Sequence, residues 1–281
     1  MSEEKTVNFK KTTVRELGPT LPIGVKSPQG AVGKELVVRP WRMREEKAIA
    51  RALSALPDEN FGTRLAIVMS VMCQRLGPVD LDQIKDIPAR RLIISTMTMP
   101  DVFYAYIWLR IQAIGNEIKF NFKCPKQKCH HEFEFVADLM STEVKVPVDE
   151  TDLYWEYKLK TPVQIRGLTV EGFRMGPQQW MTAENAVASD GPKVSVIQGS
   201  IRGFSNEKTI DKTTNQPIEQ KLLDSELDEI TKYDLEGMFS AISKHQFGPV
   251  MAVDVTCPQC EHSWESSIDW RYESFFVVSS D

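Results

Sequence analysis

The chain has 281 residues, of which 42% are hydrophobic and 26% are charged, and its formal net charge is −5 at pH 7. These values are typical of a folded protein with one large domain or two ordinary ones, and they exclude an intrinsically disordered chain. The negative net charge disfavours nucleic acid as a partner, although a local basic patch remains compatible with it.

The start of the sequence is polar, and no run approaches the roughly 20 apolar residues that a membrane-spanning helix needs. We therefore expect neither a secretory signal nor a membrane partner. In a reducing cytosol, which this implies, closely spaced cysteines are more often metal ligands than disulfides.

Glycine and proline recur through residues 1–34 too often for a long helix or strand, so we expect an extended N-terminal arm. The next segment, residues 35–116, is predicted to be mainly helical after a short strand at 35–39. Asp101 is expected to cap its last helix and Gly115 to end it. The predicted helices cover residues 41–56, 61–76, 90–97 and 101–114.

After Gly115 the apolar residues alternate with polar ones, which indicates a strand that leads into Cys124. Glu132–Ala137 is predicted to be the return strand, and Met251–Thr256 another strand that leads into Cys257. The segment between them, residues 140–249, is predicted to be an inserted mixed β/α region. It should include a mobile loop near 205–220 and a helix over 225–245, at whose end His245 is a cap or a partner of the helix dipole.

Two short knuckles share one pattern: a strand, a Cys-Pro turn, a second cysteine, a histidine two residues later, then an aromatic residue and a glutamate. They are Cys124-Pro125-Lys126-Gln127-Lys128-Cys129 and Cys257-Pro258-Gln259-Cys260 with the residues that follow each. Two hairpin tips that each supply two thiolates form a zinc ribbon. We therefore predict one structural zinc ion on Cys124, Cys129, Cys257 and Cys260, with residues 117–139 and 250–281 as the two halves of a split ribbon. The predicted fold class is α+β.

Other roles for the cysteines and their neighbours compete with this interpretation. His130, His131 or His262 could replace a cysteine as ligand, and the second pair alone could be a redox dithiol. A deaminase site is disfavoured, because each proline follows the first cysteine of its knuckle and the two halves are too far apart. Cys73 lies on an apolar helical face and is expected to be a buried structural thiol.

No phosphate-binding loop, nucleophile elbow or zinc-protease helix occurs in the sequence, so we expect neither an enzyme nor a small-molecule substrate. The carboxylates of Glu45-Glu46 and Asp228-Glu229 are interpreted as solvated helix faces. The terminal aromatic residues, from Trp270 to Phe276, are expected to pack in the core or against a partner.

Several short motifs follow one another in a fixed order within residues 21–276. They are Val37-Val38-Arg39-Pro40-Trp41, Glu45-Glu46, Leu109-Arg110, Ile114-Gly115, the Cys-Pro knuckle at Cys124, Phe247-Gly248-Pro249, Cys257-Pro258-Gln259-Cys260 and Phe275-Phe276. In this order they resemble the T-even-type baseplate hub and baseplate-assembly proteins of contractile-tailed bacteriophages. The chain departs from that family's pattern at Leu21-Pro22-Ile23-Gly24, where the family has Leu-Pro-Ser-x-Gly, and in its longer first knuckle.

The resemblance implies a non-enzymatic component or assembly factor of the baseplate, in the hub or the wedge, that binds other phage tail proteins. It implies a location in the host cytoplasm during assembly, and it leaves open whether the protein stays in the tail baseplate of the virion. The alternative is a zinc-ribbon nucleic-acid-binding protein, which is suggested by the basic stretch of Arg39, Arg42, Arg44, Lys47 and Arg51. A metalloenzyme that uses a glutamate such as Glu132 is a third hypothesis.

Overall fold

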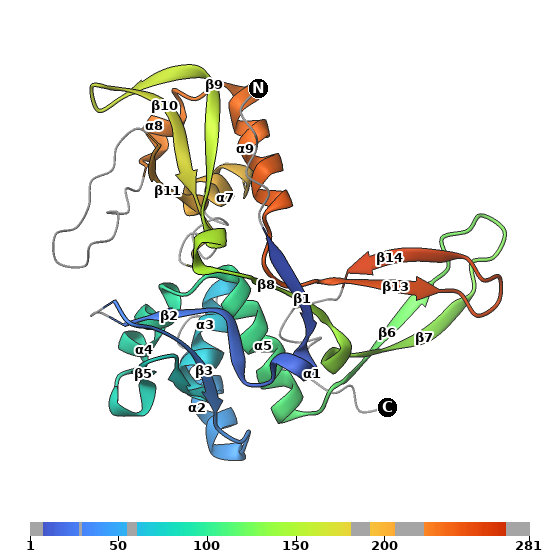
Figure 1. Cartoon of the computed structure of the whole chain (residues 1–281). Helices are drawn as coiled ribbons and strands as arrows, with labels where there is room; N and C mark the ends of the chain where they lie inside the picture. The colour runs from blue at the N-terminus through green and yellow to red at the C-terminus, as the bar shows by residue number, and fades with distance from the viewer. Residues whose placement is uncertain (1–7, 28–29, 55–60, 181–191, 206–221, 268–281) are drawn as a thin grey trace.

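The computed structural model describes residues 8–27, 30–54, 61–180, 192–205 and 222–267. They form an α+β fold in which all the paired strands are antiparallel, as the sequence predicts. Figure 1 shows two bodies, one above the other, and two long hairpins that project together from their side. In the described part of the chain, no helix is both long and apolar enough to cross a membrane.

The lower body is built on one large hydrophobic core. Its longest helix, the central α5, is buried along most of its length and therefore apolar on nearly every side. A sheet in the order β2-β3-β4-β5 packs beside them. The elements are α1 (Val14–Leu17), β2 (Thr20–Lys26), β3 (Val32–Val38), α2 (Met43–Ser54), α3 (Phe61–Met72), β4 (Cys73–Leu76), β5 (Val79–Asp80), η1 (Leu81–Gln83), α4 (Ile87–Ser95) and α5 (Met99–Ala113).

The upper body has a second core, formed between a three-stranded sheet and helices that pack on it. The predicted inserted region is wider than this body, because its first strand, β8 (Glu143–Pro147), pairs with β1 (Phe9–Thr13) and β12 (Gly248–Pro249) in a separate sheet. The remaining elements are η3 (Glu150–Leu153), β9 (Trp155–Ile165), β10 (Leu168–Met175), α7 (Pro192–Ser200), β11 (Ile201–Phe204), α8 (Asp224–Leu227) and α9 (Lys232–Lys244). Most of the predicted loop near 205–220, and the aromatic residues from Trp270 onward, lie outside the described residues.

The two hairpins leave the lower body at the end of α5 and after β12. The first consists of β6 (Glu117–Lys123) and β7 (Glu132–Asp138), which is followed by η2 (Leu139–Ser141). The second consists of β13 (Ala252–Thr256) and β14 (Ser263–Ser267). Both strands that were predicted to lead into a knuckle, the first of them from alternation, are present.

The first described residues, from Asn8 onward, are incorporated in the fold. They were expected to form an extended arm, and the segment 8–26 is indeed largely extended, but it pairs with β8 and β3. Val14 and Leu21 have no exposed surface. Glycine and proline residues therefore mark the turns between short strands in this segment, and the apolar residues between those turns belong to the core.

Asp101 explains how this segment is held. It was expected to be the N-cap of α5, but Thr98 is the N-cap and Asp101 is the third residue of the helix, with no exposed surface. Its carboxylate accepts N–H groups of Ile23 at 2.8 Å and Gly24 at 3.1 Å, and the Thr98 hydroxyl at 2.9 Å. Burial raises the pKa of this carboxyl, and these hydrogen bonds act in the opposite direction. Asp101 thus joins β2 to α5.

Two predicted helices are shorter than the apolar pattern suggests. The predicted helix 61–76 ends at Met72, because Cys73–Leu76 pairs with β3 instead. Gly77 turns the chain into β5 with φ 55°, and a Cβ there would lie 2.4 Å from the carbonyl oxygen of Gly33.

The predicted helix 225–245 is broken into α8 and α9. Thr231 caps α9, and the buried Asp234 on its first turn accepts the N–H groups of Lys160 at 2.9 Å and Thr161 at 3.4 Å. The predicted cap at the other end is present, since His245 is the C-cap residue and its Nδ1 lies 2.6 Å from the carbonyl oxygen of Ala241.

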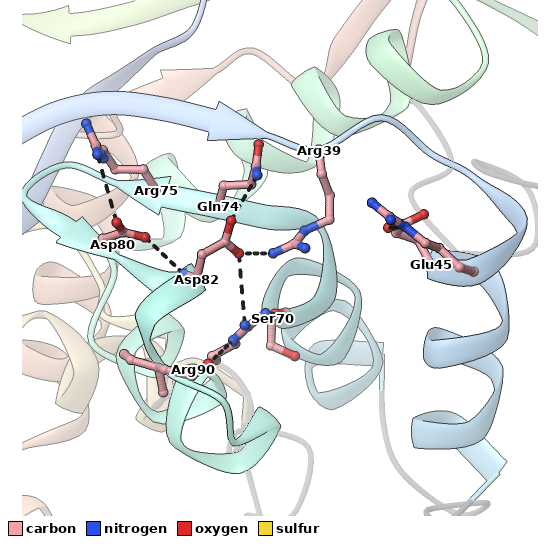
Figure 2. A network of polar contacts seen from close by, with 10 residues as sticks. Arg39, Glu45, Ser70, Gln74, Arg75, Asp80, Asp82 and Arg90 are labelled. Atoms are coloured by element: carbon pink, nitrogen blue, oxygen red, sulfur yellow. Dashed lines mark hydrogen bonds and ion pairs between the residues drawn. The ribbon is translucent and has the colours of Figure 1, made fainter.

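A polar network fixes one end of the lower sheet (Figure 2). Asp82 accepts a hydrogen bond from Arg39 and another from Gln74 at 2.9 Å, and Arg90 lies 4.0 Å away. Burial opposes ionisation of Asp82, but the hydrogen bonds of Gln74 and Arg39 outweigh it and lower its pKa.

Glu45 was expected to be solvated, but it faces the protein from the first turn of α2 and is only 4% exposed. Its carboxylate pairs with Arg44 at 2.5 Å.

The role of Asp101 gives a first testable expectation. Asp101→Ala should lower the free energy of unfolding by about 3 kcal/mol or more, because it leaves the N–H groups of Ile23 and Gly24 without an acceptor. Asp86→Ala removes a carboxylate that accepts a single N–H at the exposed start of α4, and should cost about 1 kcal/mol. Urea unfolding of both variants measures the difference, and equal losses would contradict the assigned role.

Candidate metal centre

All four predicted cysteines meet where the tips of the two hairpins converge. One sulfur atom from each of Cys124, Cys129, Cys257 and Cys260 lies within 4.8 Å of the other three. The Sγ atoms of Cys124 and Cys260 are 3.7 Å apart, and those of Cys129 and Cys257 are 3.8 Å apart. Each of these two close pairs joins one knuckle to the other, so the cluster connects the hairpins.

The knuckles repeat one backbone conformation. In each, the N–H of the first cysteine donates across the hairpin to the carbonyl oxygen of the histidine, from Cys124 to His131 and from Cys257 to His262, both at 2.9 Å. The residue after the second cysteine is left-handed in both, with φ 48° at His130 and 55° at Glu261. This turn directs the return strand back along the hairpin and keeps both thiols of a knuckle on one side of its tip. The repeat seen in the sequence is therefore also a repeat of structure.

The histidines beside the cysteines lie outside the cluster. His131 stacks on Phe133 with ring centroids 5.9 Å apart, and His262 stacks on Trp264 at 6.0 Å. Among the described residues, the group that could hold a metal ion consists of the four cysteines and contains no histidine. The sulfur atoms alone offer a complete set of four ligands.

Aromatic side chains pack between the two hairpins behind the cysteines. Trp264 of β14 meets the rings of Phe122 and Phe133 edge to face, with both centroid distances at 6.1 Å. Phe122 also contacts Phe120 and Phe135. Each of these rings is half-buried, so the contact between the hairpins is small and depends on the cluster at the tips for the rest of its stability.

The sulfur atoms differ in their surroundings. Cys124 and Cys257 have no exposed surface, whereas Cys129 and Cys260 are partly exposed. Burial raises the pKa of Cys124. Burial opposes ionisation of Cys257 too, but the backbone N–H groups of Gln259 and Cys260 outweigh it and lower its pKa. A bound cation would favour the thiolate form at all four positions.

Cys73 is far from this chemistry. It is fully buried, as predicted, but on β4 rather than on a helix, and burial raises its pKa to about 12. Glu132, the acid considered for a metalloenzyme, is exposed and pairs with Lys123 at 3.3 Å. Sequence reasoning found the cysteines but missed the partners of Trp264, for which the shared aromatic position after each knuckle was the available signal.

Comparisons with protein-family models, with curated proteins and with solved structures give no match to this chain.

The cluster predicts different outcomes for two cysteine substitutions. Cys257→Ser should remove most of the bound metal and speed hydrogen exchange in both hairpins, while amides of α5 in the separate lower core stay protected. Cys73→Ala should leave the metal content unchanged, because its thiol lies outside the cluster. Elemental analysis and exchange monitored by mass spectrometry measure both effects. A Cys257→Ser protein that keeps its full metal content would show that the cluster is not the site.

Proposed function

We propose that the four cysteines bind one zinc ion, which has a structural role. The distances between sulfur atoms support this assignment: zinc–sulfur bonds of about 2.3 Å place the corners of a tetrahedron about 3.8 Å apart. The two close pairs of sulfurs, at 3.7 and 3.8 Å, fit that edge. In the elemental analysis described above, the metal is therefore expected to be zinc, at about one ion per chain.

The composition of the site supports a structural role over a catalytic one. Catalytic zinc keeps a position open for water or substrate, whereas four thiolates fill the tetrahedron. Within the part of the chain that the structure describes, no second group of three or more histidine, cysteine or acidic side chains could hold a metal. We therefore propose a non-enzymatic protein whose metal fixes two hairpins to each other.

We further propose that this protein is a component or an assembly factor of the baseplate of a contractile-tailed bacteriophage. The support is the ordered set of motifs in the sequence, together with the structural positions that two of them occupy. Arg110 donates hydrogen bonds to the carbonyl oxygens of Gly115 at 2.5 Å and Glu117 at 2.9 Å, at the junction between α5 and the first hairpin. A Cβ on Gly248 would lie 2.8 Å from Pro100, so the start of the second hairpin needs glycine there.

These positions have one property in common: they shape the places where the hairpins leave the lower body. Motifs at such positions are evidence for a fold shared with the baseplate family, and less direct evidence for a shared binding surface. The proposed partners are other baseplate or tail proteins, bound in the host cytoplasm, and the proposal includes neither a membrane nor a small-molecule substrate. The hub and the wedge are both compatible with it.

The experiment that tests this function is deletion of the coding region in the phage. Infected cells should then contain few complete tails by electron microscopy, and the wild-type chain supplied from a plasmid should restore them. The tagged chain should also copurify with identified baseplate proteins from infected cells. Normal infectious particles in its absence would contradict the proposal.

A nucleic-acid-binding role remains the second candidate because of α2. Arg44, Lys47 and Arg51 follow one another at helical spacing and are exposed along one face of that helix. Two of the five basic residues in the stretch from Arg39 to Arg51 are paired, Arg39 with Asp82 and Arg44 with Glu45. That pairing reduces the positive potential available to a phosphate backbone.

A salt titration separates the two candidates. Fluorescence anisotropy with labelled duplex and single-stranded DNA should show no binding at low ionic strength if the baseplate proposal is right. Affinity that falls steeply with salt, and that weakens in a Lys47→Glu/Arg51→Glu variant, would favour the nucleic-acid role instead. Lys158→Glu/Lys232→Glu, which makes the same change in net charge at exposed positions on β9 and α9 of the upper body, serves as the control.

A further inference from the structure

A groove of about 270 Å³ lies between the two hairpins, near their base. One side is the end of β7, the other is the start of β13, and η2 with the following residues closes the end. Its lining combines apolar side chains with three acids and contains no lysine or arginine. The lining residues are Phe135, Val136, Ala137, Asp138, Ser141, Thr142, Glu143, Val250, Ala252, Val253 and Asp254.

Both strands present a free edge to this groove. In an antiparallel pair, alternate residues direct their N–H groups to the partner strand and the others direct them outward. The bonds from Cys124 to His131 and from Leu139 to Asn116 fix this alternation in the first hairpin, so Val136 and Asp138 face outward on β7.

The same reasoning applies to the second hairpin. The bond from Cys257 to His262 makes Ala252 and Asp254 the outward residues of β13. The N–H groups of these two residues, and of Val136 and Asp138, donate to no described residue. Two unpaired strand edges on one hollow are a template for an additional strand.

The charges around the groove favour a cationic occupant. Two of the three exposed glutamates on the first hairpin have a lysine beside them, with Lys119 3.1 Å from Glu134 and Lys123 3.3 Å from Glu132. The third, Glu117, does not line the groove. On the second hairpin, Asp254 lies directly opposite Glu265, both are exposed, and neither has a basic partner among the described residues. Like charges in this arrangement repel each other, and a positive charge bound between them would relieve the repulsion.

The other two acids of the groove are already compensated. Asp138 pairs with Arg15 at 3.1 Å and Glu143 with Lys11 at 3.0 Å. The uncompensated charge is therefore localised on β13, on the same strand edge that offers the N–H groups of Ala252 and Asp254.

We propose that this groove binds an extended segment of a partner protein, which adds as a strand to the free edge of β13 and places a lysine or arginine beside Asp254 and Glu265. Alternate side chains of that segment would contact the apolar lining at Phe135 and Val253, as in other cases of strand addition. The proposal depends neither on the identity of the metal nor on a role in phage tails. Its failure would leave the proposed function standing, because the two are tested by different experiments.

The test uses the complete chain with its metal and a fluorescein-labelled peptide of about eight residues in which valine and lysine alternate. A peptide with glutamate in place of lysine is the charge control, and one with N-methylated alternate amides is the backbone control. We expect the valine–lysine peptide to bind at least about tenfold more tightly than either control, and to slow hydrogen exchange at Ala252 and Asp254.

Two protein variants sharpen this measurement. Asp254→Lys should weaken binding of the valine–lysine peptide by about tenfold or more, whereas Glu171→Lys, with the same change in net charge on β10, should leave it unchanged. Metal content and the exchange of α5 amides report that both variants fold. Equal binding of the three peptides, or equal binding by the two variants, would overturn the proposal.

Exchange of the free protein distinguishes other occupants. If Ala252 and Asp254 are already protected in the dilute chain and lose that protection in a chain that ends at Ser267, the groove binds the chain's own C-terminal residues. If protection rises with protein concentration, it binds a second copy. Either result would overturn the assignment to a partner protein.

Discussion

The meeting of four thiols between two hairpins is the constraint on which the arrangement of this molecule depends. Cys124 and Cys260 are separated by 136 positions in the sequence, yet their sulfur atoms are 3.7 Å apart. The chain between these two cysteines must therefore begin and end at the same place. Closing a loop of that length costs configurational entropy. Contacts elsewhere must therefore bring the hairpins together before the four sulfur atoms can bind one metal ion.

Those contacts lie at the base of the hairpins. The sheet of β1, β8 and β12 gathers segments from the start, the middle and the end of the chain. Trp180, which follows the upper body's sheet, lies in the lower core and is 2% exposed. Its backbone N–H donates to the carbonyl oxygen of Met97 at 2.8 Å, and its ring meets Phe103 edge to face at 5.9 Å. The entrance and exit of the long loop are thus fixed without the metal, which leaves the cysteine cluster to order the tips.

What could be predicted from the sequence was local. Alternation over β6 and the spacing within each knuckle involve neighbours in the chain, and the four cysteines chosen on that basis do lie close together. The failures came where a distant segment decides the outcome. Cys73 continues a helical apolar pattern, but pairing with β3 makes it a strand residue, and Asp101 has the sequence of a cap but accepts N–H groups from β2. Neither partner is visible in a window of sequence around the residue itself.

The cysteine cluster also determines how the molecule would carry a mechanical load. With a metal bound, tension applied between the N-terminal strands and the end of β14 would pass from α5 along β6 to the sulfur atoms and leave along the second hairpin. The upper body lies inside the loop that the cluster closes, so that path bypasses it. Its sheet and helices could then unfold or change shape without lengthening the route between the two ends, and the resistance of the chain to stretching would be set by metal–sulfur bonds and by the two hairpins.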